Sequence, residues 1–299
     1  MDNAVIRHAG IEDTEQILAM VREMNISDYL HEIWPVWVQN TSAVHLVTMV
    51  EGRIAGCIHG RLSAGQDAWA QGLRVTTGLR HRGIATSLLT ALEEELRRKG
   101  ARTIFATISR FNHLSLMTVA KLEWEVAFSI IRRRLKIDSL QAAVKKVPCG
   151  NQPLLDLREI SRIVRLSGVL ASRRATAFFK RVYFSMTQEF LREALVADVV
   201  RTNDFPAAVA ILDPDPAEDK GLWVITLSGA PSGMAPLFIN LAAEAAQNQI
   251  DLIVDSPDDP EIQAVLDDLG FEPAGKDGRF VVVRKELVQS RPENVSERI

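Results

Sequence analysis

The chain has 299 residues, 47% of them hydrophobic and 24% charged, which is typical of soluble globular proteins and leaves room for two domains. Its two cysteines, Cys57 and Cys149, cannot form a disulfide framework and match no zinc-ligand spacing. The net charge of −3 argues against nucleic-acid binding, and no segment approaches the ~18 apolar residues of a membrane span. We therefore expect a cytoplasmic protein with no metal, no membrane partner and no nucleic-acid partner.

Six elements are expected before residue 78. Apolar residues at helical spacing predict helices, apolar residues in alternation predict strands, and Glu51-Gly52 is a two-residue hairpin signal. Pro35 is expected to break the second helix, because proline has no backbone N–H. The elements are a strand at 4–8, helices at 12–24 and 27–40, two strands within 43–62 and a strand at 68–77.

The helix expected from Ile84 onward has the clearest pattern in the chain. Its apolar residues fall on one face, each of three glutamates precedes a basic residue by four positions, and Gly100 is placed to cap it. The apolar face holds Ile84, Leu88, Leu92 and Leu96, and the charged pairs are Glu93–Arg97, Glu94–Arg98 and Glu95–Lys99. A strand at 102–109, a helix at 112–124 and one or two strands at 126–137 follow.

The second half is expected to repeat this order of elements after a polar linker near Pro148, Gly150 and Pro153. The predicted helices cover 155–168, 176–185, 187–195, 235–249 and 260–270. The predicted strands cover 196–202, 207–213, 221–229, 251–256 and 278–287. The charge differs between the halves: residues 1–146 hold 19 basic and 15 acidic residues, and the remainder holds 16 and 23. The basic first half is therefore the better host for an anionic cofactor.

Arg80, His81 and Arg82 stand directly before Gly83 at the mouth of the clearest helix. A helix N-terminus has unpaired N–H groups and partial positive charge, so it can bind phosphate, and a glycine lets the backbone approach closely. The segment is thus a candidate pyrophosphate cradle, although the local sequence equally allows a helix start with solvated arginines. P-loop and dinucleotide-binding glycine motifs are absent.

The order strand, Arg-x-x-Gly-x-Ala, helix, strand, Asn-x-x-Ser, helix resembles the GNAT superfamily of N-acetyltransferases over about residues 4–137. Arg80, Gly83 and Ala85 match the first motif, and Asn112 and Ser115 match the second. The resemblance implies an α/β (α+β) fold with a mixed, mostly antiparallel central sheet flanked by helices. It also implies acetyl-CoA as co-substrate and direct attack of a primary amine on the thioester. The acceptor would be a small molecule or a peptide.

The resemblance also implies which residues hold the cofactor. The strand residues Leu73 and Val75 would hydrogen-bond the pantetheine arm through their backbone. The full expected set is Leu73, Val75, Arg80, His81, Arg82, Gly83, Ile84, Ala85, Thr86, Asn112 and Ser115.

Catalytic residues are less well marked. Val119 stands where the family often has a tyrosine acid, and Glu123-Trp124 replaces the usual Gly-Phe pair. The strand position that often carries a glutamate base reads Ala70, Gln71, Gly72. Candidate bases are Asp28, Tyr29 and His31, with His59 and His113 as further histidines, although structural roles are open for each. A non-catalytic acyl-CoA sensor is therefore the alternative to an enzyme.

The second half ends with Leu269-Gly270-Phe271, which matches the family's closing Gly-Phe, so the chain resembles tandem GNAT proteins similar in layout to mycothiol synthase. Ala-Pro-Ser-Gly-Met-Ala-Pro, ending at Pro236, replaces the basic loop, and Asp259 stands near the position of Asn112. We expect a GNAT domain at 1–140, a linker at 141–152, a degenerate GNAT-like domain at 153–290 and a tail at 291–299. The second domain would support the acceptor side of the first.

Overall fold

The computed structural model describes residues 4–24, 28–62, 66–136, 138, 176–179, 182–185, 200–204, 207–212, 221–229 and 231–287. The expected linker, the tail and the predicted helices at 155–168 and 187–195 lie outside these residues. No helix within the described ranges has the length and apolar character needed to cross a membrane.

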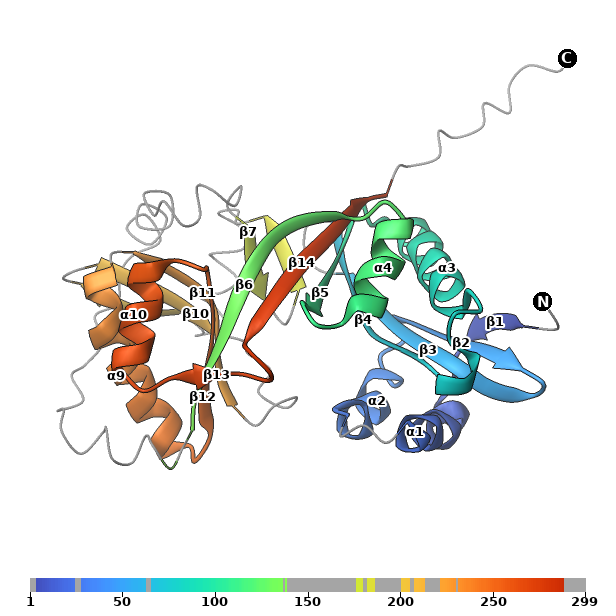
Figure 1. Cartoon of the computed structure of the whole chain (residues 1–299), viewed down its shortest axis with the longest axis horizontal. Coiled ribbons are helices and arrows are strands. Elements are labelled where there is room, and N and C mark those ends of the chain that lie inside the picture. The colour runs from blue at the N-terminus through green and yellow to red at the C-terminus, as the bar shows by residue number, and fades with distance from the viewer. Residues whose placement is uncertain are drawn as a thin grey trace, which may run out of the picture. The chain divides into compact units, whose positions relative to one another are not determined.

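The chain divides into two compact units that interleave along the sequence (Figure 1). The first unit comprises Met1–Ala106, Met117–Glu125 and Arg284–Ile299. The second comprises Thr107–Leu116 and Val126–Val283. The C-terminal residues are thus part of the first unit.

In the first unit, a sheet is built in chain order from strands β1 to β5. Every pairing is antiparallel except that of β4 with β5, which is parallel. The strands are β1 (Val5–His8), β2 (Val44–Val50), β3 (Arg53–Leu62), β4 (Asp67–Val75) and β5 (Thr103–Ser109), of which the part up to Ala106 belongs to this unit. The expected hairpin turn is confirmed: both Glu51 and Gly52 have positive φ, as a two-residue type I′ turn requires.

Helices cover both faces of this sheet (Figure 1). The turn η1 (Ile11–Asp13) leads into α1 (Thr14–Glu23), which packs with α2 (Leu30–Trp37) on one face around Val47, Ile54 and Cys57. On the other face lies α3 (Ile84–Arg98), so close that a Cβ at Gly60 would stand 2.6 Å from Leu92. Its C-terminus is capped as expected, with Gly100 at a φ of 97°.

Pro35 does not break α2, so that expectation was wrong. The helix continues through it, and the Val38 N–H donates to the Trp34 carbonyl at 3.0 Å. Proline removes only the hydrogen bond to the carbonyl of His31, and the buried residues Leu30, Ile33, Trp34 and Trp37 hold the helix against the core.

From β9 onward, the described part of the second unit repeats the order of elements that the chain follows from β2 to β6. Strands β9 (Val200–Asp204), β10 (Ala207–Leu212) and β11 (Gly221–Gly229) are antiparallel, and β11 pairs with β12 (Asp251–Ser256) in parallel. Helix α9 (Pro231–Gln247) joins β11 to β12, and α10 (Pro260–Asp268) follows β12. The expected fold class is thus confirmed.

Long strands continue the sheet of the second unit beyond β12. Antiparallel to β12 runs β6 (Glu125–Leu135), which also pairs with the short β13 (Glu272–Pro273). The last strand, β14 (Arg279–Glu286), neighbours β6. Both β6 and β14 contribute residues to each unit. Helix α4 (His113–Lys121) precedes β6.

Two predictions in the second half were wrong. Residues 176–185 were expected to be a helix, but they contain the antiparallel strands β7 (Thr176–Phe179) and β8 (Val182–Ser185). Their threonine, valine and aromatic residues favour strands, and this preference prevails. Helix α9 begins at Pro231, four residues before the expected start, so Pro236 lies inside the helix.

Candidate functional site

Strand β4 extends well beyond its pairing with β5. The parallel register covers only Asp67, Ala68 and Trp69, whereas β4 runs on to Val75 alongside β3. Gly72 has a φ of 68°, and the register with β3 shifts between Cys57 and His59, so β4 is bulged at this point. The end of β4, including the expected residues Leu73 and Val75, therefore has a backbone edge not paired with β5.

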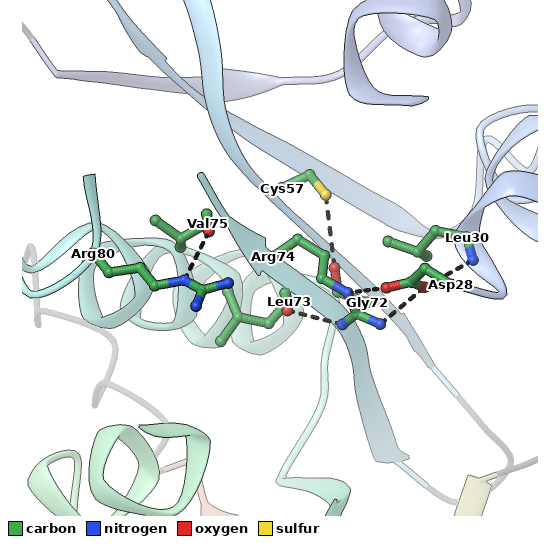
Figure 2. A network of polar contacts seen from close by, with 8 residues as sticks. All are labelled: Asp28, Leu30, Cys57, Gly72, Leu73, Arg74, Val75 and Arg80. Carbon is green, nitrogen blue, oxygen red and sulfur yellow. Dashed lines mark hydrogen bonds and ion pairs between the residues drawn. The ribbon is translucent and has the colours of Figure 1, made fainter. Parts of the chain in front are cut away.

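A loop of residues 76–83 connects this strand end to helix α3. It begins with the turn η3 (Thr77–Leu79), and the side chain of Arg80 folds back so that Nε donates to the Val75 carbonyl at 3.3 Å (Figure 2). His81 adopts a φ of 62°, and His81, Arg82 and Gly83 are exposed. The structure thus brings the loop arginine back to the end of β4.

The start of α3 fits a phosphate group. Gly83 occupies the N-cap position with a φ of 81°, no side chain caps the helix, and no acidic residue lies in its first turn. A Cβ at Gly83 would find no atom within 4 Å, so packing does not require glycine there. Gly83 thus provides a positive φ and leaves open space at the helix start. The first-turn N–H groups of Ile84, Ala85 and Thr86 are available there to bind an anion.

Residues 11–118 match the model of the acetyltransferase (GNAT) family. The N-terminal part of the chain is therefore similar to the GNAT acetyltransferases. A search of curated proteins by sequence found no match.

Solved structures extend the likeness to the whole chain. A GCN5-related N-acetyltransferase from Sphaerobacter thermophilus aligns with a TM-score of 0.62 at 13% identity, covering 96% of each chain. A tandem GNAT protein from the clavulanic acid biosynthesis pathway aligns with a TM-score of 0.58 at 16% identity, covering 97% of this chain and 100% of that one. The chain therefore has the fold of a tandem GNAT protein.

The side chain of Asp28 is hydrogen-bonded to Arg74 near the end of strand β4 (Figure 2). Its carboxylate accepts from Arg74 Nε at 2.5 Å, from Arg74 Nη2 at 3.0 Å and from the Leu30 N–H at 3.0 Å. The side chain of Asp28 is 1% exposed, and that of Arg74 is 22% exposed. Burial alone would lower the pKa of Arg74, but the hydrogen bond and charge of Asp28, with Tyr29, raise it above its ordinary value.

The three candidate bases therefore stand in different surroundings. The Asp28 carboxylate already accepts three hydrogen bonds, whereas Tyr29 and His31 are half-buried at the start of α2. The ring of Tyr29 lies edge-on to Trp37, and the Arg74 guanidinium is 5.5 Å from its centroid. Arg74 was missed by the sequence reasoning, because no local signal links it to an aspartate 46 residues away.

Beneath α2, two histidines form a buried row with Gln71. His45 and His59 are cross-strand partners on β2 and β3, and His59 is paired in register with Gln71 on β4. The Trp37 ring stacks on His59 at 4.2 Å. Both ring nitrogens of His59 and Nε2 of His45 have no hydrogen-bond partner among the described residues. Burial, followed by the charges of His45 and Arg61, lowers the pKa of His59 well below its ordinary value, so it is a neutral core residue and a weak base.

Asn112 and Ser115 fall in the second unit. The Asn112 side-chain oxygen accepts from the Ser115 N–H at 3.2 Å, and the Leu116 N–H donates to the Asn112 carbonyl, so Asn112 caps α4. Asp259 does the same for α10, accepting from the N–H groups of Glu261 and Ile262. The two positions matched in the sequence thus share a capping role.

Between β11 and α9, the described part of the second half has no counterpart of the basic loop. Only Ala230 separates β11 from α9, whereas eight residues separate β4 from α3. Ser232 to Ala235, expected to be a degraded loop, lie in the first turns of α9, and Met234 is fully buried. No group of three or more His, Cys, Asp or Glu residues in the described part of the chain could hold a metal ion.

Proposed function

We propose that the chain is an acetyl-CoA-dependent N-acetyltransferase with one cofactor site, in its N-terminal GNAT domain. The observation that carries this proposal is the uncapped start of α3 at Gly83, joined by a basic loop to a strand end unpaired with β5. The proposed cofactor-binding residues all lie in the first unit: Leu73, Val75, Arg80, His81, Arg82, Gly83, Ile84, Ala85 and Thr86.

Each part of this site has a proposed task. Backbone N–H groups of Ile84 to Thr86 and the charges of Arg80 and Arg82 bind pyrophosphate oxygens. Backbone groups at Leu73 and Val75 hold the pantetheine arm and polarise the thioester carbonyl as charge develops on its oxygen. Bound acetyl-CoA supplies an activated acetyl group.

The acceptor is a primary amine of a small molecule or a peptide, which attacks the carbonyl directly. It must lose a proton, because a lysine-like amine has a pKa near ~10.4. We propose His31, acting through water, to receive that proton, since Asp28 is engaged with Arg74 and a phenol such as that of Tyr29 is a poor proton acceptor. Val119 cannot protonate the departing thiolate, but a thiol with a pKa near ~8.5 is a tolerable leaving group at neutral pH.

The second half is proposed to have no cofactor site of its own. Where the described strand β11 meets α9 there is no such basic loop, and the first turns of that helix carry no arginine. Its proposed task is to support the acceptor side of the first domain.

Release of the coenzyme A thiol from acetyl-CoA, measured against a panel of primary amines, tests the reaction. We expect amine-dependent release by the wild type and its loss in Gly83→Glu, which places a negative charge in the open space at the helix start. Tight acetyl-CoA binding by the wild type without turnover on any amine would instead favour a non-catalytic acyl-CoA sensor.

A further inference from the structure

We infer that the Asp28–Arg74 ion pair is a positioning device, which fixes the end of β4 in the geometry that acetyl transfer requires. The inference rests on the proposed function, because it assigns the pair to the strand that would hold the thioester. Neither side chain is proposed to touch the reacting atoms.

The end of β4 needs such support because its neighbours hold it on one side only. Beyond Trp69 it has no register with β5, and its register with β3 is interrupted next to the Gly72 bulge. A strand in this state could shift by a fraction of an ångström with little loss of pairing. Catalysis by preorganised hydrogen-bond donors does not tolerate such a shift.

Arg74 fastens this strand end to the beginning of α2. Its Nη1 donates to the carbonyl of Leu73 at 2.9 Å, while Nε and Nη2 hold both oxygens of Asp28 (Figure 2). The Leu30 N–H in turn donates to Asp28, so the carboxylate is fixed by the helix backbone. The β4 segment has a further contact with β3: the thiol of Cys57, whose pKa burial raises to about 12, donates to the Gly72 carbonyl at 3.6 Å. The Arg74 guanidinium is therefore held by Asp28 before α2 and by the Leu73 carbonyl on β4.

The first unit contains a matched pair of the same construction. Asp13 accepts from both terminal nitrogens of Arg7 at 2.7 Å and from the Gly10 N–H at 2.9 Å, and its side chain is 4% exposed. This pair joins β1 to the start of α1, and the other hydrogen bonds of Arg7 go to His8 and Met49. Asp13→Asn therefore removes a bidentate pair with a similarly buried carboxylate from the same domain at a place away from the proposed cofactor strand, although Arg7 is more exposed than Arg74.

The test compares wild type, Asp28→Asn, Arg74→Lys and Asp13→Asn in the full-length chain. Arg74→Lys keeps the positive charge but loses the fork, which protects the test if Asp28→Asn folds poorly. Melting temperatures are measured first. Acetyl-CoA affinity, kcat and KM follow, together with hydrogen exchange of peptides covering residues 70–76 and 80–86 with and without coenzyme A.

We expect Asp28→Asn and Arg74→Lys to lower kcat by about tenfold to 100-fold while the affinity for acetyl-CoA changes by less than about threefold. Coenzyme A should protect residues 80–86 in every variant, but protection of residues 70–76 should be lost in these two alone. Asp13→Asn should lower the melting temperature and leave kcat unchanged.

Equal protection of residues 70–76 in all four proteins, or an equal loss of kcat in Asp13→Asn, would overturn the inference and leave the proposed function standing. Absence of coenzyme A protection at residues 80–86 in the wild type would overturn the proposed function, and this inference with it.

Discussion

At the level of single residues, Arg80 and Arg82 are the two arginines of the loop that leads into the uncapped start of α3. Charge-assisted contacts to phosphate contribute roughly 1.5–3 kcal/mol each. We therefore expect Arg80→Ala combined with Arg82→Ala to weaken acetyl-CoA binding by at least about 100-fold if the contacts add independently. Calorimetric titration measures this, with Arg98→Ala at the other end of the helix as control. A change below about threefold in the double variant would contradict the proposed site.

The buried histidines predict a dependence of stability on pH. Burial lowers the pKa of His45 and, to a greater extent, of His59, so in acid the unfolded chain binds protons that the folded chain excludes. The folded state is therefore favoured above pH 6.5, and the free energy of unfolding should fall as the pH drops below that value. Each histidine contributes a slope of up to about 1.4 kcal/mol per pH unit in this window.

Chemical denaturation between pH 5 and pH 8 measures that slope. His59→Gln should flatten it, whereas His113→Gln, at an exposed position on α4, should leave it unchanged. An identical slope in wild type and His59→Gln would show that the pair does not stay neutral in the folded state.

At the scale of elements, helices α4 and α10 end in the same geometry with different residues. Glu123 has a φ of 60° and Gly270 a φ of 81°, and the following Trp124 and Phe271 donate to the carbonyls of Val119 and Leu266. Glu123-Trp124 therefore has the same backbone conformation as Gly270-Phe271, although its residues differ from the family's Gly-Phe. Glutamate at this position is strained, since side chains disfavour the left-handed region.

We expect Glu123→Gly to raise the free energy of unfolding by about 1 kcal/mol and Gly270→Ala to lower it by a similar amount. A Cβ at Gly270 would meet only Leu135, at an ordinary 3.9 Å, so the effect in the second helix comes from the backbone. Thermal unfolding of both variants provides the measurement, and shifts of the same sign would contradict the account.

Local signals predicted most elements, and contacts distant in sequence account for the rest. The two-residue turn at Glu51-Gly52 and the apolar face of helix α3 are local sequence signals, so both elements could be predicted from the sequence alone. At Pro35 the packing of the buried face of α2 outweighs the loss of one backbone hydrogen bond. Helix α9 begins at Pro231, shortly after strand β11 ends, which is earlier than the sequence pattern predicted. Residues 80–86 were enough to propose the loop as a candidate site, whereas the Asp28–Arg74 pair joins segments 46 residues apart and has no local signature.

At the scale of the whole molecule, the interleaved units make the C-terminal residues part of the first unit. Glu93 of α3 is buried and accepts from Trp124 Nε1 at 2.7 Å and from Lys285 Nζ at 2.6 Å. The Leu287 N–H donates to the Arg102 carbonyl nearby. The sequence pattern paired Glu93 with Arg97 on the helix surface, but the structure turns its carboxylate toward the core.

Lys285→Met should therefore destabilise the chain by about 2 kcal/mol, because it leaves a buried carboxylate with one donor fewer. Lys136→Met, which breaks the exposed pair with Glu272, should have a much smaller effect. Denaturant unfolding of the two variants compares them directly. Equal effects would mean that Lys285 is not a structural part of the first unit.

We propose that the chain binds one acetyl-CoA, at Arg80 to Thr86. Titration calorimetry of the full-length wild type with acetyl-CoA, repeated with Gly83→Glu, tests it most directly. We expect close to one cofactor per chain in the wild type and no measurable binding in the variant. Two cofactors per chain, or equal affinity in both proteins, would contradict it.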